Sequence, residues 1–254
     1  MNEQTAAIIL AAGRGTRLNS QTINKVALPF NGKPIIEYAV EAMEPVASHV
    51  VVVVGAFADS VKEALKNHPA VIYAEQTEQL GTGHAAKVGL EPLKPFTPTT
   101  VLVGYGDHMM FYTPETIQKL IDLHTNKKAT ISMITVRHEE PNKLAWGRIV
   151  RDEHDTIVKS VEQKDANDDE LMIEELNAGF YAFDYQYLSE TIDLVPRSEV
   201  SGEYYLNALI SMAAADGRTL AGLVVPFEEV GIGINRAEEL EASQKLHESR
   251  GNAI

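Results

Sequence analysis

The chain contains no cysteine among its 254 residues. Disulfide bonds, thiolate metal ligands and cysteine nucleophiles are therefore excluded. Basic residues are also scarce, since 22 Lys and Arg stand against 36 Asp and Glu and leave a formal net charge of −14. A surface of that sign repels nucleic acid and anionic membranes on average, so we expect neither as a partner. Any phosphate substrate has to be met by cations gathered locally.

Long apolar runs are missing as well. Beyond the N-terminal strand, the longest is His49 to Phe57, which falls well short of the ~20 residues needed to span a bilayer. The chain begins Met-Asn-Glu-Gln without a basic region, and its first apolar stretch is too short for a signal peptide. We therefore expect a cytoplasmic protein. Hexapeptide repeats of the kind that build a left-handed β-helix are also absent.

Short apolar runs alternate with helical patterns through the first half of the chain. Residues 5–11 and 50–54 are rich in Ile, Val and Ala, as in strands buried on both faces of a parallel sheet, and residues 34–43 between them have helical spacing. The alternation continues with a helix at 58–67, a strand at 71–74, a helix opening at Gly81 and a strand at 99–104. It predicts an α/β protein with a doubly wound, mainly parallel, Rossmann-like sheet.

The second half is richer in strands and has no linker before it. Strands are expected at 130–137, 147–151, 156–162, 177–183 and 219–225, and helices at 185–194, 203–215 and 236–249. A chain of this length fits one large α/β domain, or one domain with a subdomain. We expect a single domain over residues 1–254, whose smaller β-rich portion begins at about residue 129.

The first strand runs into a glycine loop that carries two arginines, and a lysine follows. The run is Leu10-Ala11-Ala12-Gly13-Arg14-Gly15-Thr16-Arg17, with Lys25 downstream. A glycine turn after a strand often serves only the bend. Here, bare backbone N–H groups and fixed cations converge where a triphosphate could lie. The loop lacks the Gly-Lys-Ser/Thr of a Walker loop and the glycine spacing of a dinucleotide fold.

Together with later segments, this loop resembles the sugar-phosphate nucleotidyltransferase family, and within it the pyrophosphorylase domains of N-acetylglucosamine-1-phosphate uridylyltransferases. The matching strings occur in the family's order from residue 8 to about residue 240. They are LAAGRGTRLNS, NGKPIIEYAV, Gln76, LGTGHA from Leu80, Tyr105-Gly106-Asp107, WGRI from Trp146, VEQKDA from Val161, ELNAG from Glu175, GEYY from Gly202 and Gly233-Ile234-Asn235.

The resemblance implies which of these residues would bind and activate the nucleotide. The substrate is expected to be UTP, and the catalytic residues to be Arg17 on the leaving pyrophosphate and Lys25 near the transferred phosphate. The nucleotide-binding residues are expected to be Leu10, Ala11, Ala12, Gly13, Gly15, Thr16, Gln76, Gly81 and Thr82. Taken alone, Gln76 would be interpreted as an exposed polar loop residue. Residues 1–128 would then form the nucleotide-binding half.

The resemblance also implies a Mg²⁺ cofactor. It further implies that residues 129–254, together with the end of the first half, bind a sugar 1-phosphate acceptor. Asp107 and Asn235 are the implied metal ligands, although Asn235 could equally cap the helix that follows it. The implied sugar-binding residues are Tyr105, Gly147, Glu162, Asn177 and Tyr205. The attacking phosphate is largely ionised at neutral pH, its second pKa being about 6, so no general base is needed.

Several positions depart from the family's strings. Asn24 stands where proline commonly precedes the lysine, Trp146 replaces a tyrosine, and Asn207-Ala208 follow the GEYY segment in place of Thr-Asp. These changes bear on the sugar more than on the type of reaction.

The expected reaction is uridylyl transfer from UTP to N-acetylglucosamine 1-phosphate, with three alternatives. Another sugar 1-phosphate, such as glucose 1-phosphate, could be the acceptor, or dTTP or CTP the donor. The third alternative is a non-catalytic nucleotide-sensing or scaffold protein on the same fold. Because no repeat segment follows, neither an acetyltransferase domain nor coenzyme A binding is expected. The sequence carries no signal for an oligomeric state.

Overall fold

The structure, a computed structural model, describes residues 4–13, 22–234 and 236–251. The strands are β1 (Thr5–Leu10), β2 (Pro29–Phe30), β3 (Lys33–Pro34), β4 (His49–Val54), β5 (Ile72–Glu75), β6 (Thr100–Tyr105), β7 (Ile131–Arg137), β8 (Gly147–Arg151), β9 (Ile157–Val161), β10 (Glu175–Asp184) and β11 (Leu220–Val224). The α-helices are α1 (Ile35–Met43), α2 (Ala58–Ala64), α3 (Thr82–Leu90), α4 (Pro114–Lys127), α5 (Asp168–Leu171), α6 (Tyr185–Thr191), α7 (Ala208–Ala215) and α8 (Ala237–Gly251).

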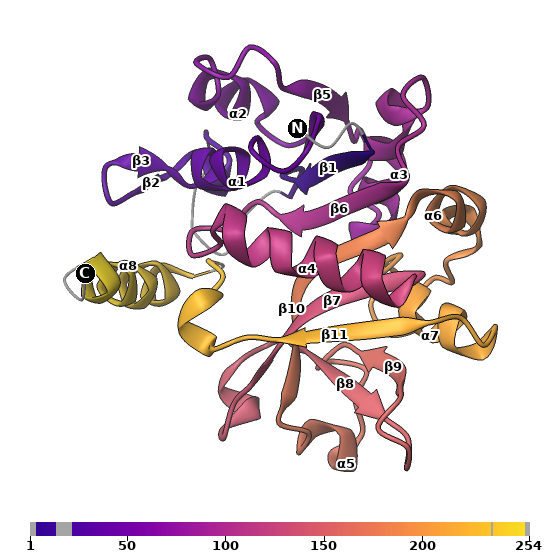
Figure 1. The fold of residues 1–254 in the computed structure, drawn as a ribbon. Helices are drawn as coiled ribbons and strands as arrows, with labels where there is room; N and C mark the ends of the chain where they lie inside the picture. Colours follow the sequence, from indigo (N-terminus) through magenta and orange to yellow (C-terminus); the bar gives the residue numbers. More distant parts are fainter. Residues whose placement is uncertain (1–3, 14–21, 235, 252–254) are drawn as a thin grey trace.

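One mixed sheet runs through both halves of the chain. Its path is β11-β7-β10-β6-β1-β4-β5, and β8 and β9 continue from β10. Strand β1 pairs in parallel with β4 and β6, β4 with β5, and β7 with β11, whereas β10 is antiparallel to both β6 and β7. Every strand on this path except β10 therefore points the same way. The predicted α/β class with a mainly parallel sheet is confirmed (Figure 1).

Helices cover both faces of the sheet, as a doubly wound fold requires. Along β1, Ala7 and Ile9 join one apolar cluster with α1 and α4, while Ile8 and Leu10 join another with α3, α6 and α7. The continuous apolar pattern of β1 thus arises because both of its faces are buried. Along the described parts of the chain, no helix combines the length and the apolarity needed to cross a bilayer.

Helix α4 has no counterpart among the elements predicted from the sequence. Its start follows familiar rules, since Thr113 Oγ1 accepts a hydrogen bond from the Thr116 N–H and Pro114 occupies the first helical position. The helix buries Ile117, Leu120 and Ile121 against the sheet.

The helix predicted at 203–215 begins only at Ala208. The residues before it are held by another segment, because the Tyr204 N–H donates to the Leu80 carbonyl (2.8 Å) and the Gly83 N–H donates to the Tyr204 carbonyl (2.7 Å). These hydrogen bonds between two distant segments of the chain place residues 203–206 beside the start of α3.

Candidate active site

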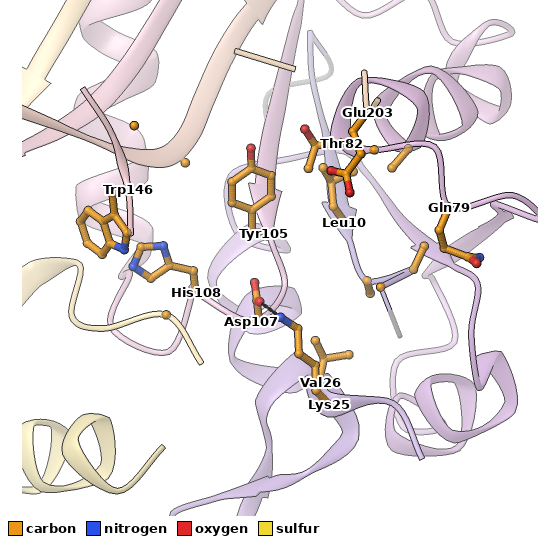
Figure 2. Close-up of a pocket in the computed structure, with 18 of the residues that line it drawn as sticks. Leu10, Lys25, Val26, Gln79, Thr82, Tyr105, Asp107, His108, Trp146 and Glu203 are labelled. Carbon is orange, nitrogen blue, oxygen red and sulfur yellow. Dashed lines mark hydrogen bonds and ion pairs between the residues drawn. The ribbon is translucent and has the colours of Figure 1, made fainter. Parts of the chain in front are cut away.

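A cavity of about 510 Å³ lies over the carboxyl ends of β1 and β6, where open α/β sheets gather their ligand groups. The sheet brings together here residues predicted for the nucleotide, the sugar and the metal. The predicted residues that line the cavity are Leu10, Ala11, Ala12, Gly13, Lys25, Gln76, Gly81, Thr82, Tyr105, Asp107, Gly147, Glu162 and Asn177. Figure 2 shows Tyr105 near the middle of the cavity, with Leu10 and Thr82 on one side and Trp146 on the other.

The described part of the glycine loop is fixed by Asn24, a fully buried residue. Its Nδ2 group donates to the carbonyls of Ala11 (3.1 Å), Gly13 (3.1 Å) and Ala56 (2.8 Å), and its Oδ1 accepts from the Val26 N–H (3.1 Å). One amide therefore joins the loop after β1 to the segment that carries the predicted catalytic lysine. No role could be predicted for Asn24 from the sequence beyond its departure from proline.

Lys25 and Asp107 form an ion pair inside the cavity (Figure 2). Their side chains are 15% and 17% exposed, so the pair is largely shielded from solvent. Asp107 offers a carboxylate at the exposed end of β6, and Mg²⁺ prefers oxygen ligands and is commonly bound through only one or two carboxylates plus substrate phosphates. The donor therefore fits a magnesium ion, and its ammonium partner fits a phosphate once the two groups separate.

The predicted base-reading residues meet at the start of α3. Gln76 is only 3% exposed, so it is not the exposed loop residue that its type alone suggests. Its Nε2 group lies 3.2 Å from the Gly81 carbonyl oxygen and 3.0 Å from His84 Nδ1. Thr82 Oγ1 accepts from the Leu206 N–H (3.0 Å). These contacts fix the start of α3 at the rim of the cavity.

On the opposite side, β10 supplies a rigid wall. Asn177 is 6% exposed, and its Nδ2 donates to Ser160 Oγ while its Oδ1 accepts from the Gly179 N–H, both at 2.9 Å. Gly179 has φ +71°, and a Cβ there would lie 2.5 Å from the Tyr105 ring. Only glycine therefore lets Tyr105 pack flat against this strand. The Asn177 side chain also hydrogen-bonds the Tyr181 side chain, so what it can still offer a ligand is the second lone pair of its oxygen.

Glu162 follows β9 and meets a residue from the start of α7. Its Oε1 accepts a hydrogen bond from Asn207 Nδ2 at 2.8 Å, and Asn207 is 3% exposed. Burial raises the pKa of Glu162 to about 7, and the negative charges of Asp165 and Glu203 act in the same direction while Lys164 opposes them. Near neutral pH this carboxyl is therefore divided between its acid and its carboxylate form.

Not all predicted residues line this cavity. Tyr205 lines a neighbouring cavity of about 350 Å³, and Glu162 borders both. Gly15, Thr16, Arg17 and Asn235 lie outside the described residues, so their roles stay predictions. The residue before Asn235 is described, and the Ile234 N–H donates to the Asp107 carbonyl at 2.9 Å.

The cavity also includes residues that the sequence did not mark as binding. These are Asn24, Val26, Gln79, Ala85, His108, Ala145, Trp146, Ala178, Gly179, Tyr181, Glu203 and Gly233. The rings of His108 and Trp146 pack edge to face, with centroids 4.6 Å apart. Burial lowers the pKa of His108, so its imidazole is neutral at physiological pH. His108 directly follows the Tyr105-Gly106-Asp107 motif and Trp146 begins the WGRI string, and these positions were the available signal.

Arg148 supports the loop that carries Trp146 and Gly147. It is fully buried, and its guanidinium donates to the carbonyls of Trp146 and Pro141 and to Asn142 Oδ1. Burial lowers the pKa of this arginine. Because its described partners are neutral oxygens, Arg148 acts as a fixed cation beneath the loop that carries Trp146 and Gly147.

The chain is similar to known proteins in both sequence and fold. The MobA-like NTP transferase domain matches residues 7–169. The chain is 40% identical over 247 residues to the bifunctional protein GlmU of Exiguobacterium sibiricum, and 35% identical over 253 residues to that of Enterococcus faecalis. These alignments cover 97% and 99% of the chain but 54% of each relative, so the chain spans about half the length of the curated relatives it matches.

The fold is shared with a solved UDP-glucose pyrophosphorylase that was crystallised with UDP-glucose. The TM-score is 0.76 at 19% identity, over 97% of this chain and 99% of that one. The family expected from the sequence is thus confirmed. The chain therefore belongs to the MobA-like NTP transferase domain family.

Proposed function

We propose that the protein transfers a uridylyl group from UTP to N-acetylglucosamine 1-phosphate, giving UDP-N-acetylglucosamine and pyrophosphate. An oxygen of the sugar phosphate attacks the α-phosphorus of UTP. The new P–O bond forms as the bond to pyrophosphate breaks, so negative charge builds on the departing group. Because the acceptor oxygen is already ionised, the protein has to position the two substrates and neutralise charge, with no proton to remove.

The observation that carries this proposal is that one cavity holds both sets of predicted residues. The segment after β1, Gln76 and the start of α3 line the side expected to take the nucleotide, while Glu162 and Asn177 offer polar groups suited to the sugar. Lys25 and Asp107 line the same cavity. We assign residues 1–128 to the nucleotide side and residues 129–254 to the sugar side of one catalytic unit.

We further propose that Mg²⁺ is the cofactor, held by Asp107 and Asn235. When bound, it would supply positive charge to the phosphates of UTP. Lys25 would leave Asp107 and donate to a phosphate oxygen near the transferred group. Arg17 would stabilise the leaving pyrophosphate. Removing a group that binds transition-state charge commonly raises a barrier by about 3 kcal/mol, so loss of either cation should reduce kcat more than substrate affinity.

The choice of sugar has two supports. The curated relatives at 35–40% identity are named GlmU, whereas the UDP-glucose pyrophosphorylase shares only 19% identity. The oxygen of Asn177 also has a second lone pair, which can accept from an acetamido N–H while the contacts to Ser160, Gly179 and Tyr181 are kept.

Pyrophosphate release over a grid of four nucleoside triphosphates and several sugar 1-phosphates tests the proposal. We expect the highest kcat/KM for UTP with N-acetylglucosamine 1-phosphate, and no turnover when chelator removes Mg²⁺. A maximum with glucose 1-phosphate, dTTP or CTP would move the assignment to that pair. Nucleotide binding without pyrophosphate release from any pair would instead indicate a sensing or scaffold protein.

A further inference from the structure

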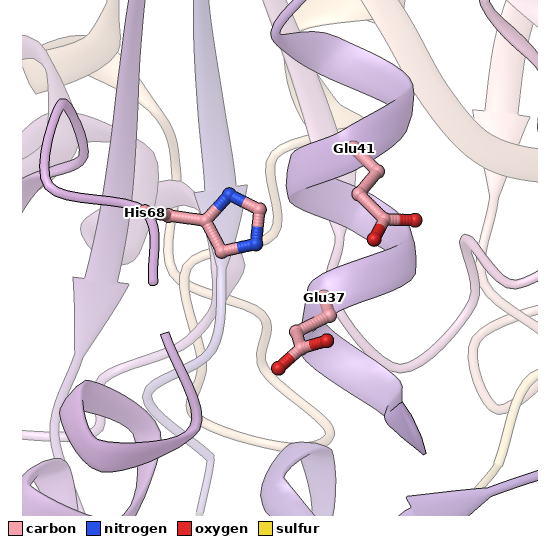
Figure 3. Close-up of side chains that lie close together, drawn as sticks. All are labelled: Glu37, Glu41 and His68. Carbon is pink, nitrogen blue, oxygen red and sulfur yellow. The ribbon is translucent and has the colours of Figure 1, made fainter. Parts of the chain in front are cut away.

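A second group of potential metal ligands lies on α1 and the turn after α2. Glu37 and Glu41 are four residues apart on α1, so their side chains share one face of the helix. His68 points its imidazole toward them (Figure 3). One carboxylate oxygen from each glutamate and one imidazole nitrogen lie within 4.8 Å of one another. None of the three residues lines the active-site cavity.

The imidazole of His68 is held in place by Glu44. Its Nδ1 lies 3.1 Å from Glu44 Oε1, and the side chain is only 14% exposed. If Nδ1–H donates to Glu44, the proton sits on that nitrogen and Nε2 keeps its lone pair. A carboxylate bound to the far nitrogen of a histidine is a common support for a metal ligand, because it fixes the ring and raises its basicity.

The charges around His68 favour a cation. Glu37, Glu41 and Glu44 bring three carboxylates together, and Lys33 is the described cation paired with Glu41. Glu37 has no hydrogen bond or ion pair with any residue that the structure describes. Besides burial, the charges of Glu41 and Glu37 raise the pKa of the adjacent Tyr38, which reflects the negative field on this face. Two negative charges thus lack a described counter-charge.

We propose that Glu37, Glu41 and His68 form a binding site for a divalent transition metal of the zinc type. An imidazole with two carboxylates suits Zn²⁺, whereas Mg²⁺ prefers ligands that are all oxygen. Bonds of about 2.0–2.2 Å require the three donors to close in, which Glu41 achieves by turning away from Lys33. Water would occupy the fourth position. The ion would tie the turn after α2 to α1, independently of the proposed catalysis.

Calorimetric titration of the full chain with Zn²⁺, at saturating Mg²⁺, tests the proposal. We expect one site whose affinity falls at least tenfold in His68→Gln and in Glu37→Gln. The matched control is His49→Gln, because the His49 ring stacks on Phe96 with centroids 3.7 Å apart and has no part in the cluster. In the wild type, Zn²⁺ at a hundredfold excess over Kd should raise Tm by about 5 °C or more.

The Lys33→Ala variant separates a metal site from a network of surface ion pairs. Lys33 competes with the ion for Glu41, so its removal should tighten Zn²⁺ binding several-fold. Equal Zn²⁺ affinity in the wild type, His68→Gln and Glu37→Gln would overturn the proposal, as would weaker binding in Lys33→Ala. Nucleotidyl transfer should be unchanged in His68→Gln. The metal-site proposal can therefore be refuted without refuting the proposed nucleotidyl transfer, and the reverse also holds.

Discussion

Replacing Asn24 with alanine should both destabilise the protein and misplace Lys25, the proposed catalytic lysine. Asn24 is fully buried, and its amide serves three carbonyls while its oxygen holds the Val26 N–H. The two N–H hydrogens of the amide are shared among three carbonyls and count as two hydrogen bonds, and the bond accepted by its oxygen is the third. We take each of these three as about 1 kcal/mol. Unfolding should therefore become easier by about 3 kcal/mol, which corresponds to a fall in Tm of about 9 °C for a chain of this size.

Two further variants make this argument specific. Asn24→Asp keeps the oxygen that caps Val26 but turns acceptor oxygens toward the carbonyls of Ala11, Gly13 and Ala56, so it should be less stable than Asn24→Ala. Asn126→Ala, at an exposed position in α4, serves as the matched control and should leave Tm within about 2 °C.

Chemical denaturation and pyrophosphate release give the two readouts for Asn24. Besides the lost stability, kcat should fall at least tenfold, since a misplacement of about 1 Å at a positioned group can cost a hundredfold. A loss of stability below 1 kcal/mol, or an Asn24→Asp protein more stable than Asn24→Ala, would show that these hydrogen bonds do not hold the loop.

Three other variants test the cavity. Burial raises the pKa of Glu162 to about 7, so the stabilising proton is fully bound below the pH at which an unfolded glutamate titrates and is lost as the pH rises through about 7. The Tm of Glu162→Gln should therefore rise relative to that of the wild type between pH 5 and pH 8. A difference in Tm that does not change with pH contradicts this. Gly179→Ala places a Cβ 2.5 Å from the Tyr105 ring and should raise KM for the sugar 1-phosphate, whereas an unchanged KM would remove this wall from the sugar site. Asp107→Ala should abolish Mg²⁺-dependent turnover and lower Tm, because it removes a partner of the shielded Lys25 ammonium; retained activity would refute the metal assignment.

The sequence predicted the fold well wherever burial follows a simple period. After their first residue, strands β1 and β4 are apolar throughout because both faces are covered, and that pattern is visible without coordinates. Helix α4 was missed although Thr113 and Pro114 mark its start, because its polar residues outnumber its apolar ones. The delayed start of α7 was not predictable locally, since it depends on hydrogen bonds between Tyr204 and residues 80–83.

Some residues of the candidate site could likewise be predicted from the sequence, and others could not. Motif residues such as Lys25, Asp107 and Asn177 could be named from their strings, and the structure places them in one cavity. Asn24 and Asn207 could not, because their importance comes from partners far away in the sequence: the loop after β1 for Asn24, and Glu162 for Asn207. A short pattern records which residue types occur, whereas the hydrogen bonds that fix them depend on how distant segments meet.

A crystal structure of the protein with UTP and Mg²⁺ tests the central claim most directly. We predict that the uracil lies beside Gln76 and the start of α3, and that the phosphates extend to Lys25, which has left Asp107 for a phosphate oxygen. UTP bound outside this cavity, or bound within it while Lys25 and Asp107 remain paired and touch no phosphate, would contradict the account.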